Sequence, residues 1–540
     1  MRIAFINMAP HRHWYGKIDY PEPVHLLAMR GICEQAGHTA ITIPYNARTL
    51  STLREQKPDV IAMSFVGSFK SAYAGAHLIL KEALEQNTLV LMGGTDVDLY
   101  PEQYAKAYGE YFQSRPTTSP PLVLVKCDGE SLFGVLAAED FQVDAALKKF
   151  GMEGLVNNGV CVVDGLPRLP LSQHNRQRNY NMATWGYVAV VKWLIKCWAD
   201  CNFCRNQPEK SESVEADEAA EETHHLISLG VREIEIAAPN FTAHVARASK
   251  IAGRLPQGLA TYDAVSRVET LAEGVVEYPA DWSNFRQGRN TISLGVESLL
   301  EDRLVWLGKF AHLGELEQQI AEAARQDERL RDILRFFSGS RTTIELYLIM
   351  LDWRMKMGEA EAEAVKALEL LHSYPTNLTI QPFSFGKMVE YAEGSRFSRG
   401  MERIDFYRFD DSRLLFLAIL MRRRREQLAP IIRAMEHQAE FVRWILPLRM
   451  LKHYLSCIQI LKQIPKESFA VDPLLPHIAA KTAAEEIVER FYLQLEESEA
   501  AELRGKVDGG FALMLQKVMA HYLMWFGEYE PDEIGSLMGI

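Results

Sequence analysis

A chain of 540 residues with 48% hydrophobic residues is long enough to build several cores, so we expect a multidomain globular protein. Acidic side chains outnumber basic ones, 71 to 59, and the formal net charge of −12 offers no general attraction to a nucleic-acid backbone. No stretch approaches the roughly 18 uninterrupted apolar residues of a membrane-spanning helix. Composition therefore disfavours nucleic-acid binding and a transmembrane span.

Two further features indicate a cytoplasmic protein. The first residues, MRIAFINM, lack the basic leader and the small-residue cleavage site of a secretory signal. The seven cysteines are too sparse and too clustered for a disulfide framework, which favours a reducing environment. Cys33, Cys161 and Cys457 lie in apolar helical or strand patterns, so we expect them to be buried and unreactive.

Residues 1–150 alternate short apolar runs with helical patterns. The strand candidates are RIAFIN, DVIAMSF, TLVLMGG and LVLVKCDGE, and the helix candidates between them are VHLLAMRGICEQAG and AYAGAHLILKEALEQ. This alternation predicts a doubly wound domain with a parallel sheet between two layers of helices. Residues 151–186, which include GLPRLPLSQHNRQRNYN, are predicted to form an extended linker.

The rest of the chain is predicted to hold a second α/β domain and a helical tail. In residues 187–395 the strand candidates are VAVVKWLI, EIEIAA, TISLGV, TIELYLIM and LTIQPF. Their alternation with helices predicts a second parallel sheet, curved into a partial (β/α) barrel. Residues 396–540 have a helical period, as in FVRWILPLRMLKHYLSCIQILKQI, and predict a helical C-terminal domain.

Three of the seven cysteines lie within eight positions of IKCWADCNFCRNQ, as Cys197, Cys201 and Cys204. They directly follow the strand candidate VAVVKWLI, at the strand end where α/β sheets bind ligands. A closed zinc site takes four protein ligands, and no second C-x2-C pair lies at a usable distance; zinc and chance spacing remain alternatives. Three thiolates with an open fourth corner suit a cubane iron–sulfur cluster in which one iron binds another molecule.

The spacing C-x3-C-x2-C, with Phe203 before the last cysteine, closely resembles the signature of the radical S-adenosylmethionine enzymes. The resemblance implies that Cys197, Cys201 and Cys204 hold three irons of a [4Fe-4S] cluster. It implies that the fourth iron chelates the amino and carboxylate groups of S-adenosylmethionine, with Phe203 near the adenine.

Two downstream segments extend this resemblance. GVREIEIAAPNFT, residues 230–242, looks like the family's second barrel strand, although Ala238 and Pro239 replace a common acidic pair. TISLGVESLLEDRLVWLGK, residues 291–309, looks like the strand that binds the nucleoside or methionine part of the cofactor. A role for Glu297 as a strand-end cap is the alternative. The cofactor-binding residues implied in addition to Phe203 are Asn240, Gly295, Glu297 and Ser298.

The first domain lacks the G-x-G-x-x-G turn of a dinucleotide site. It resembles a cobalamin-binding domain instead, with H-x-x-G after the first strand, an imperfect S-x-L, a later G-G pair and the turn CDGES. His11 replaces the usual aspartate, so His13 is either a cobalt ligand or a loop histidine. The residues that this resemblance implies are His13, Ser64, Val66, Gly67, Phe69, Gly93, Gly94, Asp128, Gly129 and Glu130.

Together these resemblances cover residues 1–395 and imply a cobalamin-dependent radical S-adenosylmethionine enzyme. Its most frequent chemistry is transfer of a methyl group from methylcobalamin to carbon, here of a small molecule or natural product. The implied cofactors are a [4Fe-4S] cluster, S-adenosylmethionine and cobalamin, and the implied partner is an electron donor such as flavodoxin or ferredoxin.

Three alternatives stay open. The same cofactors could serve a ring rearrangement, a cyclisation or an oxidation, or a non-radical methyl transfer to an aromatic carbon. A cobalamin or iron–sulfur sensor without turnover is the alternative from another class. The helical tail, which neither cofactor needs, is the expected place for substrate specificity.

Overall fold

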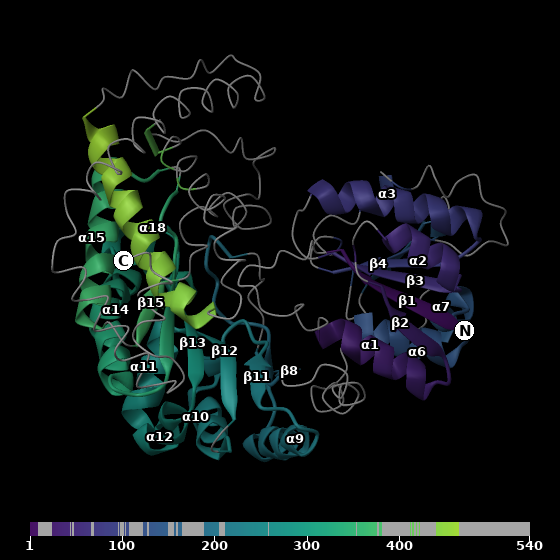
Figure 1. The fold of residues 1–540 in the computed structure, drawn as a ribbon, viewed down its shortest axis with the longest axis horizontal. Coiled ribbons are helices and arrows are strands. Elements are labelled where there is room, and N and C mark those ends of the chain that lie inside the picture. The colour runs from purple at the N-terminus through teal and green to yellow at the C-terminus, as the bar shows by residue number, and fades with distance from the viewer. Residues whose placement is uncertain are drawn as a thin grey trace, which may run out of the picture.

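The computed structural model shows two α/β units, each with its own sheet (Figure 1). The residues that it describes are 1–8, 24–43, 45, 48–65, 70–94, 97, 102, 104–106, 108, 122–126, 129–149, 156–157, 160–164, 188–204, 211–256, 259–352, 354–374, 377–380, 411, 413–414, 417, 421 and 439–463.

The first unit is built on a seven-stranded sheet in which every pair is parallel except β6 with β7. In spatial order its strands are β2 (Thr39–Thr42), β1 (Arg2–Asn7), β3 (Val60–Ser64), β4 (Leu89–Gly93), β5 (Leu122–Lys126), β7 (Val160–Asp164) and β6 (Val156–Asn157). The strand order reverses beside β1, and the carboxyl ends at such a switch point are where doubly wound sheets bind ligands.

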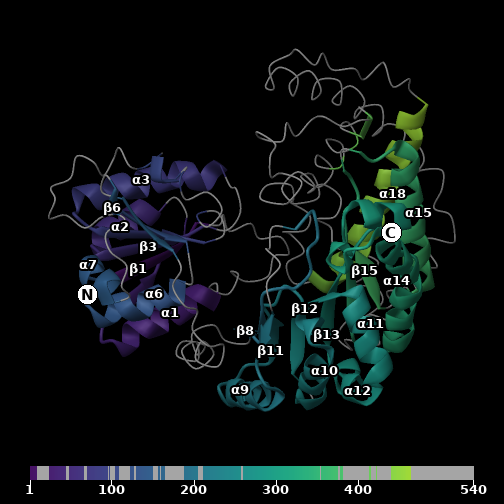
Figure 2. The ribbon, with the colours of Figure 1, turned by 180° about the vertical axis from the view of Figure 1, so that it is seen from behind.

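Helices cover both faces of this sheet (Figure 2). They are α1 (Val24–Gln35), α6 (Gly129–Ala138) and α7 (Val143–Lys149) on one face, and α2 (Thr49–Gln56) and α3 (Lys70–Glu85) on the other. Phe5 packs with Leu26 and Phe133 in one core, and Ile61 packs with Leu80 in the other. The prediction of a doubly wound parallel sheet is confirmed.

The first unit is longer than predicted. Strands β6 and β7 belong to its sheet, so the boundary at residue 150 lies too early and the predicted linker 151–186 is wrong for these strands. The run VCVVD has the apolar pattern of a covered strand, because Cys161 and Val163 pack on one face of the sheet and Val160 packs on the other.

The second unit has a six-stranded sheet in which every pair is parallel. In spatial order its strands are β15 (Leu378–Ile380), β14 (Thr343–Leu348), β13 (Asn290–Glu297), β12 (Ala260–Arg267), β11 (Glu233–Ile236) and β8 (Val188–Val191). A short antiparallel ribbon of β9 (Leu194–Ile195) and β10 (Glu212–Ser213) follows β8.

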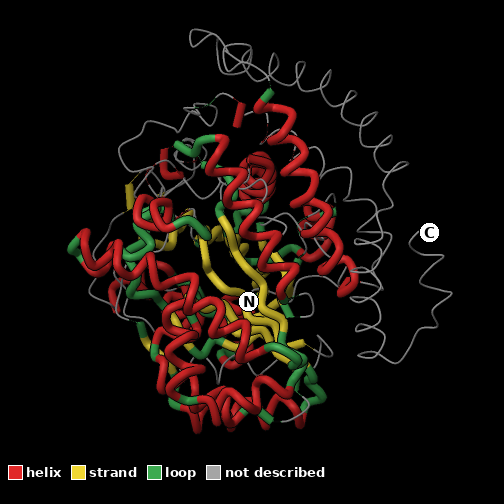
Figure 3. Tube along the Cα trace, turned by 90° about the vertical axis from the view of Figure 1, so that its left-hand side faces the viewer, coloured by secondary structure: helices red, strands yellow, loops and turns green. Residues whose placement is uncertain are grey.

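Helices pack on one face of this second sheet and form a layer outside the strands (Figure 3). Their main members are α9 (Ala216–Ser228), α10 (Val245–Arg254), α11 (Val268–Glu277), α12 (Pro279–Gln287), α13 (Glu301–Trp306), α14 (Leu316–Phe337) and α15 (Met357–Ser373). Ile234, Leu294 and Leu346 face the helices, whereas the alternating positions carry polar groups such as Glu235 and Asp263. A parallel sheet with one apolar and one polar face agrees with the predicted open barrel.

Part of the predicted helical domain belongs to the core of this second unit. Helix α18 (Ala439–Lys462) contributes Leu451, Tyr454 and Ile458 to the core around β15 and α15. The Tyr454 hydroxyl donates to the carbonyl of Met350 at 2.8 Å, which ties the helix to the loop after β14. No helix in the described ranges has the length and apolar character needed to cross a lipid bilayer.

Candidate functional site

The three clustered cysteines lie in one short loop after β8 and β9. Cys197 and Cys201 are buried, and Cys204 packs against them together with Trp198 and Phe203. The Cys204 N–H donates to the Cys201 carbonyl at 3.1 Å, which turns the loop tightly between these two thiols. All three thiols are free, so the structure brings the predicted ligands together without a disulfide.

These thiols differ in setting from the other described cysteines. Burial raises the pKa of Cys33 to about 12 and that of Cys161 to about 11, and Cys457 is fully buried, as expected for unreactive core thiols. Burial also raises the pKa of Cys197, but the Ala199 backbone N–H and the positive charge of Arg267 oppose this shift. The cysteine loop therefore contains groups that favour a thiolate, as binding to iron requires.

The cysteine loop docks on the segment that follows α13. The Asn202 N–H donates to the Leu307 carbonyl at 3.2 Å, and the Cys201 thiol donates to the Lys309 carbonyl at 3.6 Å. Gly308 between them has φ +62°, and a Cβ placed on it would lie 2.3 Å from the Asn202 amide nitrogen. A larger residue here would be strained and would have to displace the Asn202 side chain.

We therefore expect Gly308→Ala to lower the free energy of unfolding by about 1–3 kcal/mol and to displace Asn202. The positive φ is strained for alanine, and the new methyl group would clash with the Asn202 side chain. Gly339→Ala is the control, since Gly339 has a similar φ of +67° but nothing within 4 Å of its Cβ position. Chemical denaturation of both variants measures the difference. Equal destabilisation by the two changes would show that the contact with Asn202 has no energetic weight.

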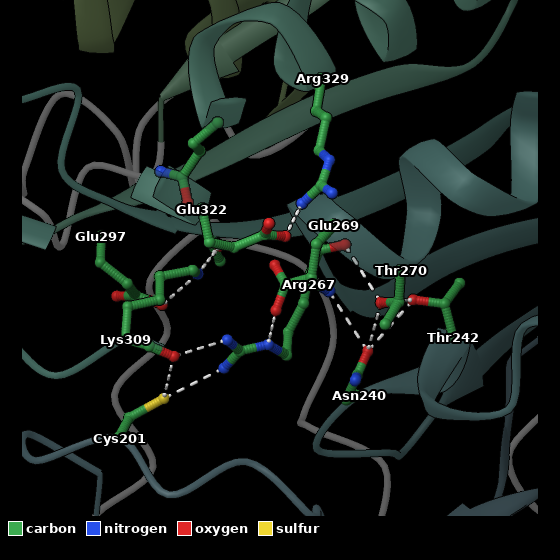
Figure 4. A network of polar contacts seen from close by, with 12 residues as sticks. Cys201, Asn240, Thr242, Arg267, Glu269, Thr270, Glu297, Lys309, Glu322 and Arg329 are labelled. Carbon is green, nitrogen blue, oxygen red and sulfur yellow. Dashed lines mark hydrogen bonds and ion pairs between the residues drawn. The ribbon is translucent and has the colours of Figure 1, made fainter. Parts of the chain in front are cut away.

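Arg267, at the carboxyl end of β12, joins the cysteine loop to the barrel (Figure 4). Its Nη1 donates to the Cys201 sulfur at 3.0 Å, and its Nη2 donates to the Lys309 carbonyl at 2.7 Å. Its Nε donates to Glu269, and its guanidinium lies over the Trp198 ring at 5.5 Å from the ring centre. Arg267 is only 7% exposed, so these contacts hold a charged group inside the protein.

A second buried cation lies next to it. Lys309 is fully buried, and its Nζ donates to the Gly295 carbonyl and lies 3.6 Å from Glu297 Oε1 (Figure 4). Burial opposes ionisation of Glu269, but the charges of Arg267 and Lys309 hold its pKa below the usual value. The pKa of Glu297 is raised because burial outweighs these cations. The site thus places the Arg267 cation beside the Cys201 sulfur and pairs the Lys309 cation with Glu297 in the same buried region.

Buried atoms without hydrogen-bond partners test whether a ligand fits here. Asn240 is fully buried; its Oδ1 accepts from the Arg267 N–H at 3.2 Å, while its Nδ2 has no partner. Glu269 Oε2 also has none. Leaving a buried polar atom unpaired costs about 1–3 kcal/mol, so such atoms indicate room for a bound molecule or water. Three thiols for iron and a free amide donor fit the donor set that the sequence resemblance implies.

The backbone is strained on both sides of this site. Lys196, directly before Cys197, has φ +63°, and Glu297 at the end of β13 has φ +68°. Left-handed backbone in residues other than glycine is unfavourable and concentrates at functional sites. The Glu297 carbonyl accepts from the Ile349 N–H at 2.7 Å, which holds the strained strand end against the loop after β14.

The described residues contain no group of three or more His, Cys, Asp or Glu side chains arranged around a single metal ion. The cysteines of a cubane cluster bind different irons, so their sulfurs need not converge on one point as zinc ligands do. The absence of a single-ion site from the described residues therefore does not bear on a cluster.

No protein-family model matches this chain, and no curated protein matches it. Among solved structures, the chain is similar to the radical S-adenosylmethionine methyltransferase TsrM from Kitasatospora setae, whose structure has cobalamin and a [4Fe-4S] cluster bound. The TM-score is 0.46 at 14% sequence identity, over 71% of this chain and 76% of that one.

Ser298 differs from the other predicted cofactor-binding residues. Its side chain is fully buried, and its hydroxyl donates to Glu363 Oε2 at 2.6 Å. Glu363 also accepts from the Leu299 N–H at 2.6 Å and pairs with Arg303 at 3.0 Å. Arg303 in turn pairs with Asp352 at 2.6 Å. The Ser298 side chain is thus part of a buried network that supports the loop after Glu297, a structural role that needs no cofactor.

The first unit brings some of the predicted cobalamin residues to one edge. Asn7, Ser64 and Gly93 align in register at the carboxyl ends of β1, β3 and β4. Gly94 has φ +102°, and a Cβ on it would lie 2.3 Å from the Phe65 carbonyl oxygen. Close backbone packing within the unit therefore explains this glycine without a corrin. His13, Val66, Gly67, Phe69 and Asp128 lie outside the described residues.

One contact links the acidic turn of the first unit to the barrel. Glu130 is 4% exposed at the start of α6, directly after Gly129, and its Oε1 lies 3.8 Å from Lys192 Nζ. Lys192 directly follows β8, in the segment that leads to the cysteines. Glu130 thus has a charged partner in the second unit.

On the polar face of the barrel, Glu235 of β11 pairs in register with Asp263 of β12. Burial, with the negative charge of Asp263, raises the pKa of Glu235 to about 7. Because the folded state holds this proton more tightly than the unfolded chain, ionisation of Glu235 lowers stability as the pH rises from about 4.5 to about 7.

Glu235→Gln is therefore expected to stabilise the protein by up to about 3 kcal/mol at pH 8 and to have little effect below pH 4.5, since each pKa unit is worth about 1.4 kcal/mol. Glu233→Gln is the control, because Glu233 is on the same strand but pairs in register with the uncharged Ala260. Urea denaturation across this pH range measures the effect. A stability change that is the same at every pH would contradict the expectation.

Sequence reasoning missed Arg267, Glu269 and Lys309. Lys309 was within a quoted motif but carried no assigned role, and β12, which carries Arg267, was not among the predicted strands. The signal that could have found Arg267 is the position of ATYDAVSR between two predicted strands.

Proposed function

We propose that this protein is a cobalamin-dependent radical S-adenosylmethionine methyltransferase that methylates a carbon atom of a small molecule or natural product. One observation carries the proposal. Three free cysteines lie at the carboxyl edge of a parallel sheet, next to the ends of β12 and β13, whose charged side chains are buried and ion-paired. The C-x3-C-x2-C spacing and the doubly wound first unit support it.

The residues divide into groups by the part that each would hold. Cys197, Cys201 and Cys204 would hold the iron–sulfur cluster. Asn240, with its free amide nitrogen, and Glu297 would orient S-adenosylmethionine, and Phe203 would lie against its adenine. Cobalamin would bind at the carboxyl edge of the first sheet, beside Ser64, Gly93 and Gly94 and the turn that contains Gly129 and Glu130. His13, Val66, Gly67, Phe69 and Asp128 are proposed to complete that site.

When bound, these groups supply reductive cleavage of S-adenosylmethionine and a transferable methyl group. The chain itself provides a closed setting for that chemistry. Arg267 neutralises negative charge beside the thiols, and Lys309 neutralises Glu297. The ion pairs with Glu269 and Glu297 keep the two cations in place. Trp198 and Phe203 pack against the cysteines and reduce the contact of the loop with water.

The test uses the full chain, reconstituted anaerobically with iron and sulfide and then supplied with cobalamin, S-adenosylmethionine and dithionite. Formation of 5′-deoxyadenosine in the absence of substrate, in a preparation that retains cobalamin, supports the proposal. A methylated product from a candidate substrate, formed together with S-adenosylhomocysteine and 5′-deoxyadenosine, completes it.

Other outcomes select other functions. S-adenosylhomocysteine without 5′-deoxyadenosine would indicate non-radical methyl transfer, and 5′-deoxyadenosine with a rearranged or oxidised product would indicate the other radical chemistry. Bound cofactors without any nucleoside product would indicate a sensor. A preparation without iron and sulfide would overturn the proposal.

A further inference from the structure

Arg267 contacts one of the three clustered thiols directly. Its Nη1 lies 3.0 Å from the Cys201 sulfur, which is a close approach for a hydrogen bond to sulfur. In Figure 4 the guanidinium lies between the Cys201 sulfur on one side and Glu269 on the other. Every nitrogen of the guanidinium has an acceptor, so its position is determined from three directions.

The surroundings hold Arg267 in this position. The Lys309 carbonyl accepts from Nη2 at 2.7 Å, Trp198 lies against the guanidinium face, and the Arg267 N–H is bound by Asn240. A residue that is only 7% exposed and fixed at every polar atom cannot turn its charge away into solvent. Its positive charge therefore acts on the Cys201 sulfur at constant distance.

We propose that Arg267 is a positioning residue that raises the reduction potential of the cluster held by Cys197, Cys201 and Cys204. The inference rests on the proposed function, since it assumes that the cluster is present. Reduction adds one electron from an external one-electron donor, and no bond in the protein forms or breaks. The reduced cluster is more negative by one charge, so a fixed cation and an N–H donor at its thiolate favour it.

Glu269 makes the proposal testable in both directions. Its carboxylate pairs with the guanidinium and offsets part of the positive charge at the thiolate. Removing the cation should lower the cluster potential, whereas removing the carboxylate should raise it. General damage to the loop would not produce shifts of opposite sign.

The experiment compares Arg267→Met, Arg267→Lys and Glu269→Gln with the wild-type chain after anaerobic reconstitution. Iron and sulfide are counted first, and the midpoint potential of the cluster is then measured by redox titration followed by electron paramagnetic resonance. We expect a lower potential for Arg267→Met, a smaller decrease for Arg267→Lys and a higher potential for Glu269→Gln. Arg331→Met is the control, because Arg331 pairs with Asp327 on the exposed surface of α14.

The outcomes separate this proposal from the proposed function. A wild-type chain without iron and sulfide would overturn the function and this role of Arg267 together. An intact cluster whose potential is the same in Arg267→Met as in Arg331→Met, or shifts of equal sign in Arg267→Met and Glu269→Gln, would overturn the role of Arg267 alone. If Arg267→Met does not fold, the comparison of Arg267→Lys with Glu269→Gln decides by the same signs.

Discussion

Glu363→Ala is expected to lower the free energy of unfolding by about 3–5 kcal/mol. Glu363 is fully buried on α15 and accepts hydrogen bonds from Ser298, from the Leu299 N–H and from Arg303. Its removal leaves the Ser298 hydroxyl and the Leu299 N–H without this acceptor and leaves the 4% exposed Arg303 with Asp352 as its remaining carboxylate partner. Unpaired buried groups of this kind cause the largest losses seen for single substitutions.

Glu361→Ala on the same helix is a matched control for that prediction. Glu361 pairs with Lys462 of α18 at 2.5 Å, but both side chains are partly exposed, 32% and 43%. Such a pair contributes about 0–1 kcal/mol. Urea denaturation of both variants gives the comparison, and similar losses in the two would mean that the buried network does not stabilise the loop after β13.

Cys201→Ala is expected to leave the reconstituted protein with little bound iron and sulfide. Two thiols would remain for a cluster that needs three, and Arg267 would lose its sulfur acceptor. Because metal affinity of a preformed site falls steeply when a ligand is removed, the visible absorption of the cluster should be lost with the iron. Iron and sulfide analysis after gel filtration under nitrogen measures both effects.

Cys33→Ala is the control for this substitution. It removes a fully buried thiol of α1 that lies in the core of the first unit. Its iron content should equal that of the wild type, with a modest loss of stability from the small cavity. Retention of a full cluster by Cys201→Ala would refute the assignment of Cys201 as a ligand.

The sequence alone was sufficient to predict the repeated apolar strands and the clustered cysteines. The apolar runs of β1, β3 and β4 predicted the first sheet, and EIEIAA, TISLGV and TIELYLIM predicted β11, β13 and β14 of the second. The thiol spacing pointed to the loop in which Cys197, Cys201 and Cys204 do come together. Local patterns report such features because each depends on a few neighbouring residues.

Features that depend on distant contacts were not predictable. Strand β12 was missed because its sequence contains no apolar run. The residues that face the helices, Ala264 and Ser266, are small. On the other face, Asp263 and Arg267 are charged. The hydrogen bond between Ser298 and Glu363 was not predictable for a related reason: Glu363 is 65 residues away and only folding brings the two together. The predicted end of the first domain at residue 150 was too early, because β7 joins the first sheet only after the two helices that follow β5.

Among the described residues, the Cys201 sulfur has two polar partners beyond its own loop, and both come later in the chain. Arg267 is 66 residues downstream and Lys309 is 108 residues downstream. During synthesis from the amino terminus, the thiol loop therefore emerges from the ribosome well before the groups that complete its surroundings. For the cluster proposed above, insertion of iron into this final environment would have to wait until translation has passed residue 309 and β13 has joined the sheet.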